Sequence, residues 1–393
     1  MANFTDMYAT IYDIHDATSS VQVDLEATQV ESTTLADLGP PTAIELFGQS
    51  YQKIHGYFSV IVCVFGIVSN VLNIIVLTRK HMKSPTNFIL TALAIADMLT
   101  MSTYPIMAIY LYIITSPDCV TPQHTRGWMY FILFHNLFIV TCHNMAMWLT
   151  VTLAVFRYIF VCQHAMAVRL CSMARAKLTV AVVVVATVVS CVPNYFVYRV
   201  QDIGPNMDRN VSCFWIVQSQ LADTNPTYEQ FVRWLFGVVI KILPCVLMAF
   251  LSTLLIIAMQ QAKKRRARLL NKVSRIVDHD HQSSEHNRTT MMLVGVVICF
   301  IVTEVPQGVL AWISAVDTDF WSDVYIHLGD LMDILVLVNS AVNFILYCIM
   351  SQQFRNTFKS LFVCDNLPFN LDRKVNKANG TEYSMVKTET TNV

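Results

Sequence analysis

The chain has 393 residues, of which 54% are hydrophobic and 14% are charged. Soluble globular proteins have about 45–50% apolar and about 25% charged residues, so the composition disfavours a soluble enzyme. Because 27 basic residues balance 27 acidic ones, it also argues against a nucleic-acid-binding protein. The 11 cysteines are too few to form a disulfide scaffold in a chain of this length.

Seven segments of the chain are apolar, and each carries at most two charged residues. Each is longer than the roughly 20 residues that an α-helix needs to cross the hydrocarbon core of a membrane. The alternation of polar and apolar residues that marks a membrane β-strand is missing from them. We therefore predict an all-α membrane protein, a seven-transmembrane helix bundle. The predicted spans are residues 57–78, 86–113, 127–156, 178–198, 234–262, 289–316 and 324–354.

The charges outside these spans predict how the chain lies in the membrane. Residues 1–54 hold eight acidic residues and one basic residue, whereas residues 259–290 hold eight basic and three acidic residues. Because basic loops stay in the cytoplasm, we expect a multi-pass plasma-membrane protein with an extracellular N-terminus and a cytoplasmic C-terminus. Residues 1–54 then form an acidic, disordered extracellular tail, and residues 55–350 form the membrane domain. The basic run 263–268 has two explanations that stay open, attraction to anionic lipid and contact with a cytoplasmic partner.

Two kinds of extracellular modification follow from this orientation. Cys119 and Cys213 are the only cysteines in segments assigned to the outside, where oxidising conditions favour a disulfide bridge. Two unpaired thiols are the alternative. Asn3 and Asn210 each begin an Asn-X-Ser/Thr sequon on the same side, so we expect glycosylation at both.

The residues after the seventh span predict a helix that lies along the membrane surface. Phe354 and Phe358 begin a row of apolar residues at helical spacing, with basic residues between them, which is typical of interfacial amphipathic helices. We assign this helix to residues 351–364, and Cys364 at its end is a candidate for palmitoylation. Residues 365–393 are polar and rich in Thr, Ser and Asn, which predicts a disordered cytoplasmic tail that can be phosphorylated.

Charged side chains inside the spans are the first candidates for function, because a charge in a membrane is energetically costly. No spacing typical of a catalytic or metal-binding motif, such as HExxH or GxSxG, occurs in the sequence, so we expect neither an enzyme nor a metal site. A transporter would show two related halves, and the two halves of this chain do not match. The charged residues within the spans are Asp97, Lys241, Glu304, Asp330 and Asp333.

Two of these charges are predicted to meet. Lys241 lies three residues before Pro244, and Glu304 lies two residues before Pro306, so both are expected near the middle of the membrane on adjacent helices. Two unpaired charges at that depth are hard to tolerate. We predict a buried ion pair between Lys241 and Glu304, to which Gln307 or His143 adds hydrogen bonds. In the alternative, Glu304 is protonated and Lys241 faces a separate water pocket.

An ordered set of short motifs resembles the rhodopsin-like G-protein-coupled receptors over residues 55–364. Several positions depart from the pattern of that family; among them Phe156 replaces an acidic residue, Glu304 a tryptophan and Phe344 a proline. The motifs in chain order are Asn70, Leu93-Ala94-Ile95-Ala96-Asp97, Phe156-Arg157-Tyr158, Pro244, Pro306 and Asn343-Phe344-Ile345-Leu346-Tyr347.

Three segments resemble the invertebrate myosuppressin and FMRFamide-type neuropeptide receptors more closely: residues 148–158, 303–308 and 350–355. The resemblance implies a receptor for a short, basic, amidated neuropeptide that activates a heterotrimeric G protein. It also implies a receptor kinase and arrestin as partners of the tail. A polytopic transporter or pore is the alternative function.

The ligand class can also be argued from charge. The third span has no acidic residue to bind an amine, and the seventh has no lysine to bind retinal. Acidic residues gather at the outer end of the seventh span and would attract a basic peptide. We expect the ligand to contact His135, Ile139, His143, Phe214, Trp215, Gln307, Asp330 and Asp333.

The resemblance also implies roles for residues deeper in the bundle. Asp97 is similar to a carboxylate that binds a sodium ion together with Asn339, Ser340 and Asn343. A hydrated Asp97 that changes its protonation on activation is the alternative, and a structural hydrogen bond to Asn70 is a third. No other cofactor is expected. Two further residues, Arg157 and Tyr347, are implied to couple the receptor to the G protein; for Arg157, an interaction with lipid phosphate is the alternative.

Overall fold

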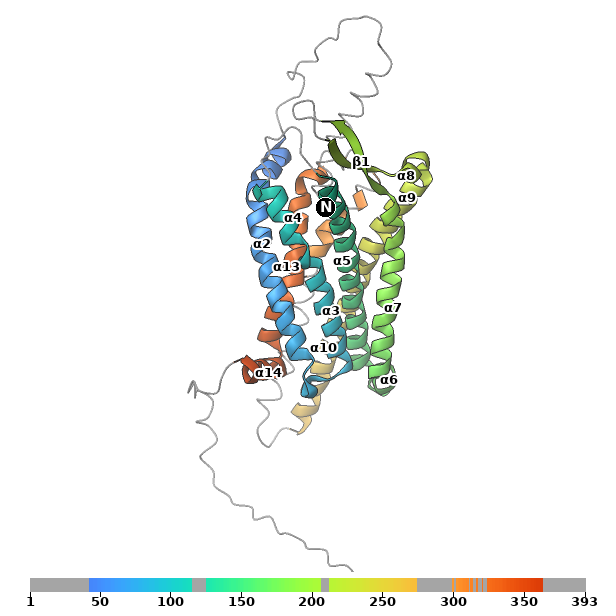
Figure 1. The fold of residues 1–393 in the computed structure, drawn as a ribbon. Coiled ribbons are helices and arrows are strands. Elements are labelled where there is room, and N and C mark those ends of the chain that lie inside the picture. The colour runs from blue at the N-terminus through green and yellow to red at the C-terminus, as the bar shows by residue number, and fades with distance from the viewer. Residues whose placement is uncertain are drawn as a thin grey trace, which may run out of the picture.

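The computed structural model describes residues 42–114, 125–205, 212–273, 299, 302–310, 312–313, 316, 320 and 324–362. Within these residues six helical segments are long and apolar enough to cross a membrane, and they form an elongated bundle (Figure 1). The sixth predicted span, 289–316, falls mostly outside the described residues, but its described part is helical over residues 302–310. The six segments are Ala43–Leu77, Pro85–Ile114, Arg126–Phe160, Met173–Phe196, Pro226–Ala258 and Ile326–Ile349.

The first helix, α2 (Ala43–Leu77), begins earlier than the sequence predicted. Thr42 accepts a hydrogen bond from the backbone N–H of Glu45, whose carboxylate accepts one from the N–H of Thr42. This capping box satisfies two backbone donors at the start of the helix. The predicted disordered tail over residues 1–54 is therefore wrong in its last residues, and residues 1–41 lie outside the described residues.

The second span is interrupted near its middle. Helix α3 (Pro85–Ser102) is followed by α4 (Tyr104–Ala108) and by η2, a π-helix over Ile109–Ile114. Pro105 lacks a backbone N–H and its ring clashes with the preceding turn, which breaks a regular helix. As a result the Thr103 side chain turns toward the neighbouring helix α5.

Helix α5 (Arg126–Cys162) lies in the middle of the bundle. It packs against α3, against α7 (Met173–Cys191) and against α10 (Leu243–Val273). Helix α7 lies at the edge of the bundle (Figure 1), and about half of its residues are exposed. Two short elements flank α7, namely α6 (His164–Leu170) before it and η3 (Val192–Phe196) after it.

A β-hairpin covers one end of the bundle, which the all-α prediction did not include (Figure 1). Strands β1 (Tyr198–Pro205) and β2 (Ser212–Gln218) are antiparallel. Alternate residues of the two strands, including Val200 and Ile216, pack on Met129 of α5. The hairpin leads through α8 (Gln220–Thr224), α9 (Pro226–Trp234) and the π-helix η4 (Leu235–Ile242) into α10.

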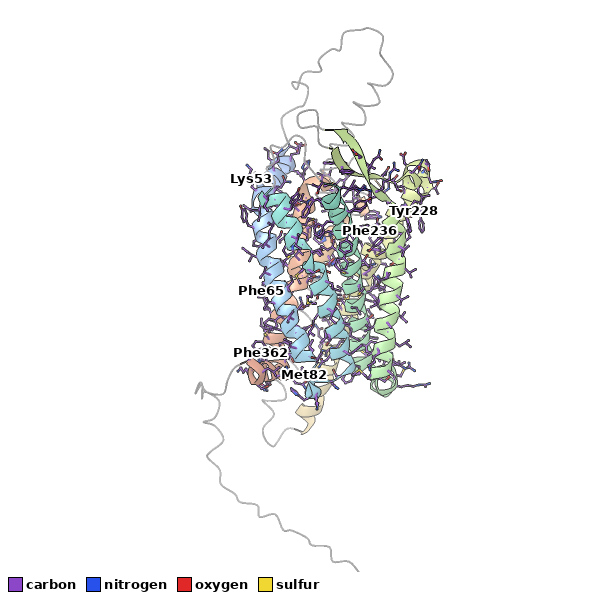
Figure 2. The ribbon with its side chains drawn as sticks, in the orientation of Figure 1. Lys53, Phe65, Met82, Tyr228, Phe236 and Phe362 are labelled. Atoms are coloured by element: carbon purple, nitrogen blue, oxygen red, sulfur yellow. The ribbon has the colours of Figure 1, made fainter. Side chains whose placement is uncertain are left out.

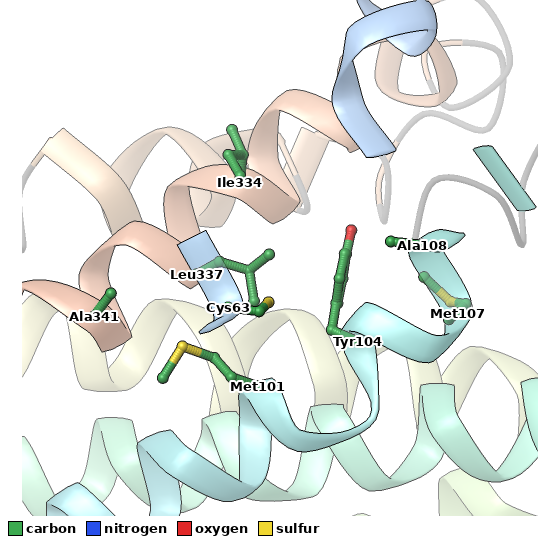
Figure 3. Packing of buried hydrophobic residues seen from close by; sticks show 8 residues of the cluster. All are labelled: Cys63, Met101, Tyr104, Met107, Ala108, Ile334, Leu337 and Ala341. Atoms are coloured by element: carbon green, nitrogen blue, oxygen red, sulfur yellow. The ribbon is translucent and has the colours of Figure 1, made fainter. Parts of the chain in front are cut away.

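Helix α13 (Ile326–Met350) packs against α2 over most of its length. A side chain at Gly66 would collide with Met101 and would place its Cβ 3.1 Å from that of Ala341, so glycine allows three helices to approach here. The apolar cluster between these helices (Figure 3) consists of Cys63, Met101, Tyr104, Met107, Ala108, Ile334, Leu337 and Ala341.

The predicted amphipathic helix is present as α14 (Gln352–Phe362). Ser351 has extended backbone angles and separates it from α13. Phe354 is buried against Tyr347, and His81 Nε2 lies 2.8 Å from Thr357 Oγ1. These contacts hold α14 at the end of the bundle opposite the hairpin, where Figure 2 shows Met82 and Phe362, whereas Lys53 and Tyr228 lie at the hairpin end.

Candidate ligand-binding site

A cavity opens between α4, α5, η4, α13 and the helical residues 302–310. Five of the predicted ligand contacts line it: His135, Ile139, His143, Gln307 and Asp333. The sequence did not assign the other five lining residues to the ligand. These are Tyr104, Val140, Ile240, Lys241 and Val336.

Tyr104 connects three helices at the wall of the cavity. Its hydroxyl donates to Asp333 Oδ2 over 3.3 Å and lies 3.0 Å from His55 Nε2. Next to it, Thr103 Oγ1 lies 2.7 Å from His135 Nδ1. The break at Pro105 places both side chains toward the interior. The only signal in the sequence for this arrangement was Pro105, which lies within the second apolar span.

The other three predicted ligand contacts do not line the cavity. Asp330 is buried beside it and accepts a hydrogen bond of 2.6 Å from the Tyr112 hydroxyl. Phe214 belongs to the apolar cluster between the hairpin and α5. Trp215, one residue later, pairs with Gln201 in the hairpin register, so a ligand would meet these two residues at the hairpin and not in the cavity.

The predicted direct ion pair between Lys241 and Glu304 is wrong. Lys241 Nζ donates to Gln307 Oε1 over 2.7 Å. Glu304 is bound by two other helices: its Oε2 lies 3.2 Å from His143 Nε2, and its Oε1 accepts a hydrogen bond of 3.0 Å from Asn339 Nδ2.

The reason for the correction lies in helix geometry. Gln307 follows Glu304 by three residues and therefore projects from a similar face of its helix. Its amide oxygen reaches the ammonium of Lys241 first, while Glu304 turns toward α5 and α13. Lys241 and Glu304 are both fully or nearly fully buried, with 4% and 1% of their surface exposed. They belong to one polar cluster, but each has its own partners.

The predicted sodium-site residues divide into two groups. Asn343 Nδ2 donates to Asp97 Oδ2 over 2.8 Å. The Ser340 hydroxyl lies near the same carboxylate without a well-formed hydrogen bond. Asn339, by contrast, binds Glu304. The side-chain amide of Asn70 does not bind Asp97 but donates to the Ser340 carbonyl oxygen over 2.9 Å.

At the opposite end of the bundle, Arg157 of α5 is partly buried and Tyr347 of α13 is buried. Among the described residues Arg157 has no ion pair. Phe156, which replaces the usual acidic neighbour, is buried against Ile89 and Ala176. The Phe156 side chain therefore serves packing, and the described part of the bundle leaves Arg157 without a carboxylate.

Four of the five predicted modification sites lie outside the described residues. The backbone of Cys213 lies in β2 opposite Gly204. Its predicted partner Cys119 lies outside the described residues, so the disulfide bridge stays a prediction. The same holds for the three remaining sites, which are Asn3, Asn210 and Cys364.

Comparison with known proteins identifies the class of this bundle. Residues 57–365 match the family described as "Serpentine type 7TM GPCR chemoreceptor Srw". The protein is thus a seven-transmembrane G-protein-coupled receptor, as the motif order predicted. The chain belongs to this family, and a transporter or pore is not favoured.

Individual relatives are receptors as well. The chain is 30% identical to the G-protein coupled receptor dmsr-1 of Caenorhabditis elegans, over 80% of this chain and 69% of the relative. It is 31% identical to the Sex peptide receptor of Drosophila melanogaster, over 85% and 77% respectively. It is 26% identical to the FMRFamide receptor of Drosophila melanogaster, over 77% and 52%.

Proposed function

We propose that this protein is a plasma-membrane receptor for a short, basic, amidated neuropeptide and that it activates a heterotrimeric G protein. The observation that carries the proposal is the cavity, in which the carboxylate of Asp333 lies among aromatic, imidazole and amide groups. A carboxylate at such a wall can pair with a guanidinium group through two hydrogen bonds. The second carboxylate, Asp330, is buried nearby and adds negative potential.

The relatives support a peptide as the ligand. Two of them are named after peptides, the Sex peptide receptor and the FMRFamide receptor. The cavity also lacks the features of other ligand classes, because α5 carries no acidic residue and α13 carries no lysine. A basic peptide is the class that both observations support.

The proposal includes the opposite end of the bundle. With an extracellular N-terminus, the hairpin end faces outward and Arg157 and Tyr347 face the cytoplasm, where they would contact the G protein. Receptor kinase and arrestin would act on the tail over residues 365–393. A sodium ion at Asp97 would stabilise the inactive state; within the described part of the chain, Asn343 donates a direct side-chain hydrogen bond to that carboxylate.

The test is a second-messenger assay in cells that express the full chain. The probes are synthetic tetra- to decapeptide amides with arginine as the penultimate residue, with FMRFamide among them. We expect a response that Arg157→Ala abolishes. Asp333→Asn should lower the potency of the best peptide by about tenfold, the effect of losing one charge-assisted hydrogen bond.

The matched control is Asp223→Asn, because Asp223 is an exposed acidic residue of α8 at the same end of the bundle. It should leave potency within about twofold of the unmodified receptor, since exposed charges are screened. Absence of any peptide response would contradict the proposal. Ion current or substrate uptake without a G protein would instead support a transporter.

A further inference from the structure

We propose that Glu304 holds the receptor in its inactive state by tying the helical residues 302–310 to α5 and α13, and that this tie opens on activation. The Glu304 tie consists of the side chains of His143, Glu304 and Asn339. The inference rests on the proposed activation of a G protein. It adds the contact within the bundle that keeps the receptor silent before any ligand binds.

The Glu304 carboxylate binds two neighbouring helices at once. Its Oε2 atom lies 3.2 Å from Nε2 of His143 in α5, and its Oε1 atom accepts a hydrogen bond of 3.0 Å from Nδ2 of Asn339 in α13. An ionised carboxylate only accepts hydrogen bonds, so the Nε2 atom of His143 carries the hydrogen. Each oxygen is used by a different helix, and a shift of the helical residues 302–310 therefore stretches both bonds.

Burial makes the Glu304 tie stronger than a contact at the surface. Only 1% of the surface of Glu304 and 6% of the surface of His143 are exposed, so bulk water does not compete for the two hydrogen bonds. Hydrogen bonds to a charged group are also stronger than those between neutral groups. A conformation in which the carboxylate leaves either partner is unfavourable, because a buried charge then lacks a donor.

The tie lies in the turn of the helix that a proline weakens. Pro306 follows Glu304 by two residues and has no backbone N–H to donate to Val302, four residues before it. Sharp bends in helices occur mostly at prolines. In the proposed orientation the residues before Pro306 belong to the cytoplasmic half of their span, the half that faces the G protein. When this half swings about the proline, Glu304 moves with it.

A second polar contact lies on the other side of this hinge. Lys241 Nζ donates to Gln307 Oε1 over 2.7 Å, and Gln307 follows Pro306 by one residue. A swing of the residues before Pro306 leaves this contact in place. The two hydrogen bonds of Glu304, by contrast, join the swinging half to helices that do not follow it, so the motion has to break them.

The size of the effect follows from a two-state equilibrium. The minor conformation of a protein is commonly populated at about 0.1–10%. Removing one charge-assisted hydrogen bond that exists in only one of the two states shifts the equilibrium by about tenfold or more. A receptor that is about 1% active without ligand should then become about 10% active.

The test measures ligand-independent second-messenger signalling per receptor at the cell surface. His143→Phe keeps a buried ring but removes the donor of α5, and Asn339→Leu keeps a similar shape but removes the donor of α13. Each should raise the basal signal by about tenfold. His143→Gln places an amide N–H near the lost imidazole N–H and should stay within about threefold of the unmodified receptor.

Two fully buried residues with other partners are the matched controls. His55→Phe removes an imidazole that binds Tyr104, and Asn144→Leu removes an amide that donates to Cys191 of α7 over 3.6 Å. These variants disturb the packing of the bundle as the test variants do, but they leave the Glu304 tie intact. Their basal signal should stay within about twofold of the unmodified receptor.

The results separate this inference from the proposed function. An unchanged basal signal in either His143→Phe or Asn339→Leu, or an equal rise in the two controls, would overturn the inference. A peptide response of the unmodified receptor would still support the peptide receptor. A rise confined to the two test variants supports the Glu304 tie, whether or not a peptide of the panel is active. His143→Leu and Asn339→Ala remove the same donors and replace a variant that does not reach the cell surface.

Discussion

Two buried polar clusters of this bundle differ in the groups that surround and stabilise a carboxylate. The Asp97 cluster uses neutral groups, since Asn343 donates to the Asp97 carboxylate and the Ser340 hydroxyl lies nearby. The Glu304 cluster uses an imidazole, an amide and a neighbouring ammonium, from His143, Asn339 and Lys241. Both carboxylates are almost completely buried: 3% of the surface of Asp97 and 1% of the surface of Glu304 are exposed.

The comparison shows that similar burial can serve different tasks. Asp97 is held by groups of one helix, α13, and its surroundings contain no cation among the described residues. Glu304 receives partners from two helices and lies beside a cavity that a ligand can enter. We therefore expect the Glu304 cluster to be the more sensitive of the two to the loss of a single group.

The largest effect should come from removing the Glu304 carboxylate. Glu304→Leu leaves His143 and Asn339 without their acceptor and leaves the Lys241 charge without a neighbouring carboxylate. We expect a loss of about 3 to 5 kcal/mol in the free energy of unfolding, the cost of an uncompensated buried charge. The measurement is the melting temperature of the purified receptor in detergent.

Glu304→Gln is the matched control, because glutamine keeps an oxygen for the amide of Asn339. Glu304→Gln should therefore lose less than half as much stability as Glu304→Leu. Equal melting temperatures for the two variants would show that the carboxylate charge, and not its hydrogen bonds, determines stability here.

A smaller effect is expected where α2 meets α13 beside the Asp97 cluster. The Asn70 amide donates to the carbonyl oxygens of Gly66 and Ser340 over 3.0 and 2.9 Å. Asn70→Ala leaves the Ser340 carbonyl without this donor and should lower stability by about 1 to 3 kcal/mol. Asn73→Ala is the control, because among the residues that the structure describes Asn73 donates to Asn70 alone, over a long 3.4 Å. If Asn73→Ala lowered stability by as much, the hydrogen bond from Asn70 to Ser340 of α13 would not explain the loss in Asn70→Ala.

A substitution in the wall of the cavity should lower the free energy of unfolding by less than Asn70→Ala does. Tyr104→Phe removes the hydroxyl that lies between His55 and Asp333 but keeps the buried ring. We expect a loss of about 0.5 to 1.5 kcal/mol, the net value of an ordinary hydrogen bond. Tyr57→Phe, at an exposed tyrosine of α2, should have no measurable effect in the same melting assay. A loss above about 3 kcal/mol for Tyr104→Phe would imply that its ring repacks.

The smallest change in stability is expected for Asp97→Asn. Asparagine keeps an oxygen that can accept from Asn343 and removes a buried charge. The melting temperature without sodium should therefore stay the same or rise. If Asp97 binds sodium, added sodium chloride should stabilise the unmodified receptor more than this variant, by mass action. Equal stabilisation of both would contradict a sodium site at Asp97.

The sequence predicted the bundle well and the site partially. Span positions follow from apolar length, and the amphipathic helix follows from the spacing of Phe354 and Phe358, because both depend only on local residue order. The hairpin was not predicted, because only β1 alternates between apolar and polar residues around Val200, whereas the apolar residues 214–217 of β2 are consecutive and lack the period-two pattern of a strand. The helix start at Ala43 was not predicted, because residues 43–54 are more polar than the span that follows, and the capping box of Thr42 and Glu45 is the local signal for this start.

The pairing of charges could not be obtained from the sequence. Depth along the helices predicted that Lys241 and Glu304 lie at a common level, and the structure keeps both in one polar cluster with His143. Rotation of each helix about its axis decides which donor meets which acceptor, and apolar packing between helices sets that rotation. Lys241 therefore meets Gln307, and Asn339 leaves the predicted sodium-site group to bind Glu304.

The sequence by itself determined that this chain is a membrane helix bundle with the motif order of a G-protein-coupled receptor. Composition and apolar length carry that information because lipid requires every backbone group to be satisfied within a helix. Only the tertiary structure decided that Lys241 lines a cavity opposite Asp333, since the break at Pro105, the π-helix η4 and the close approach at Gly66 set how the helices face one another.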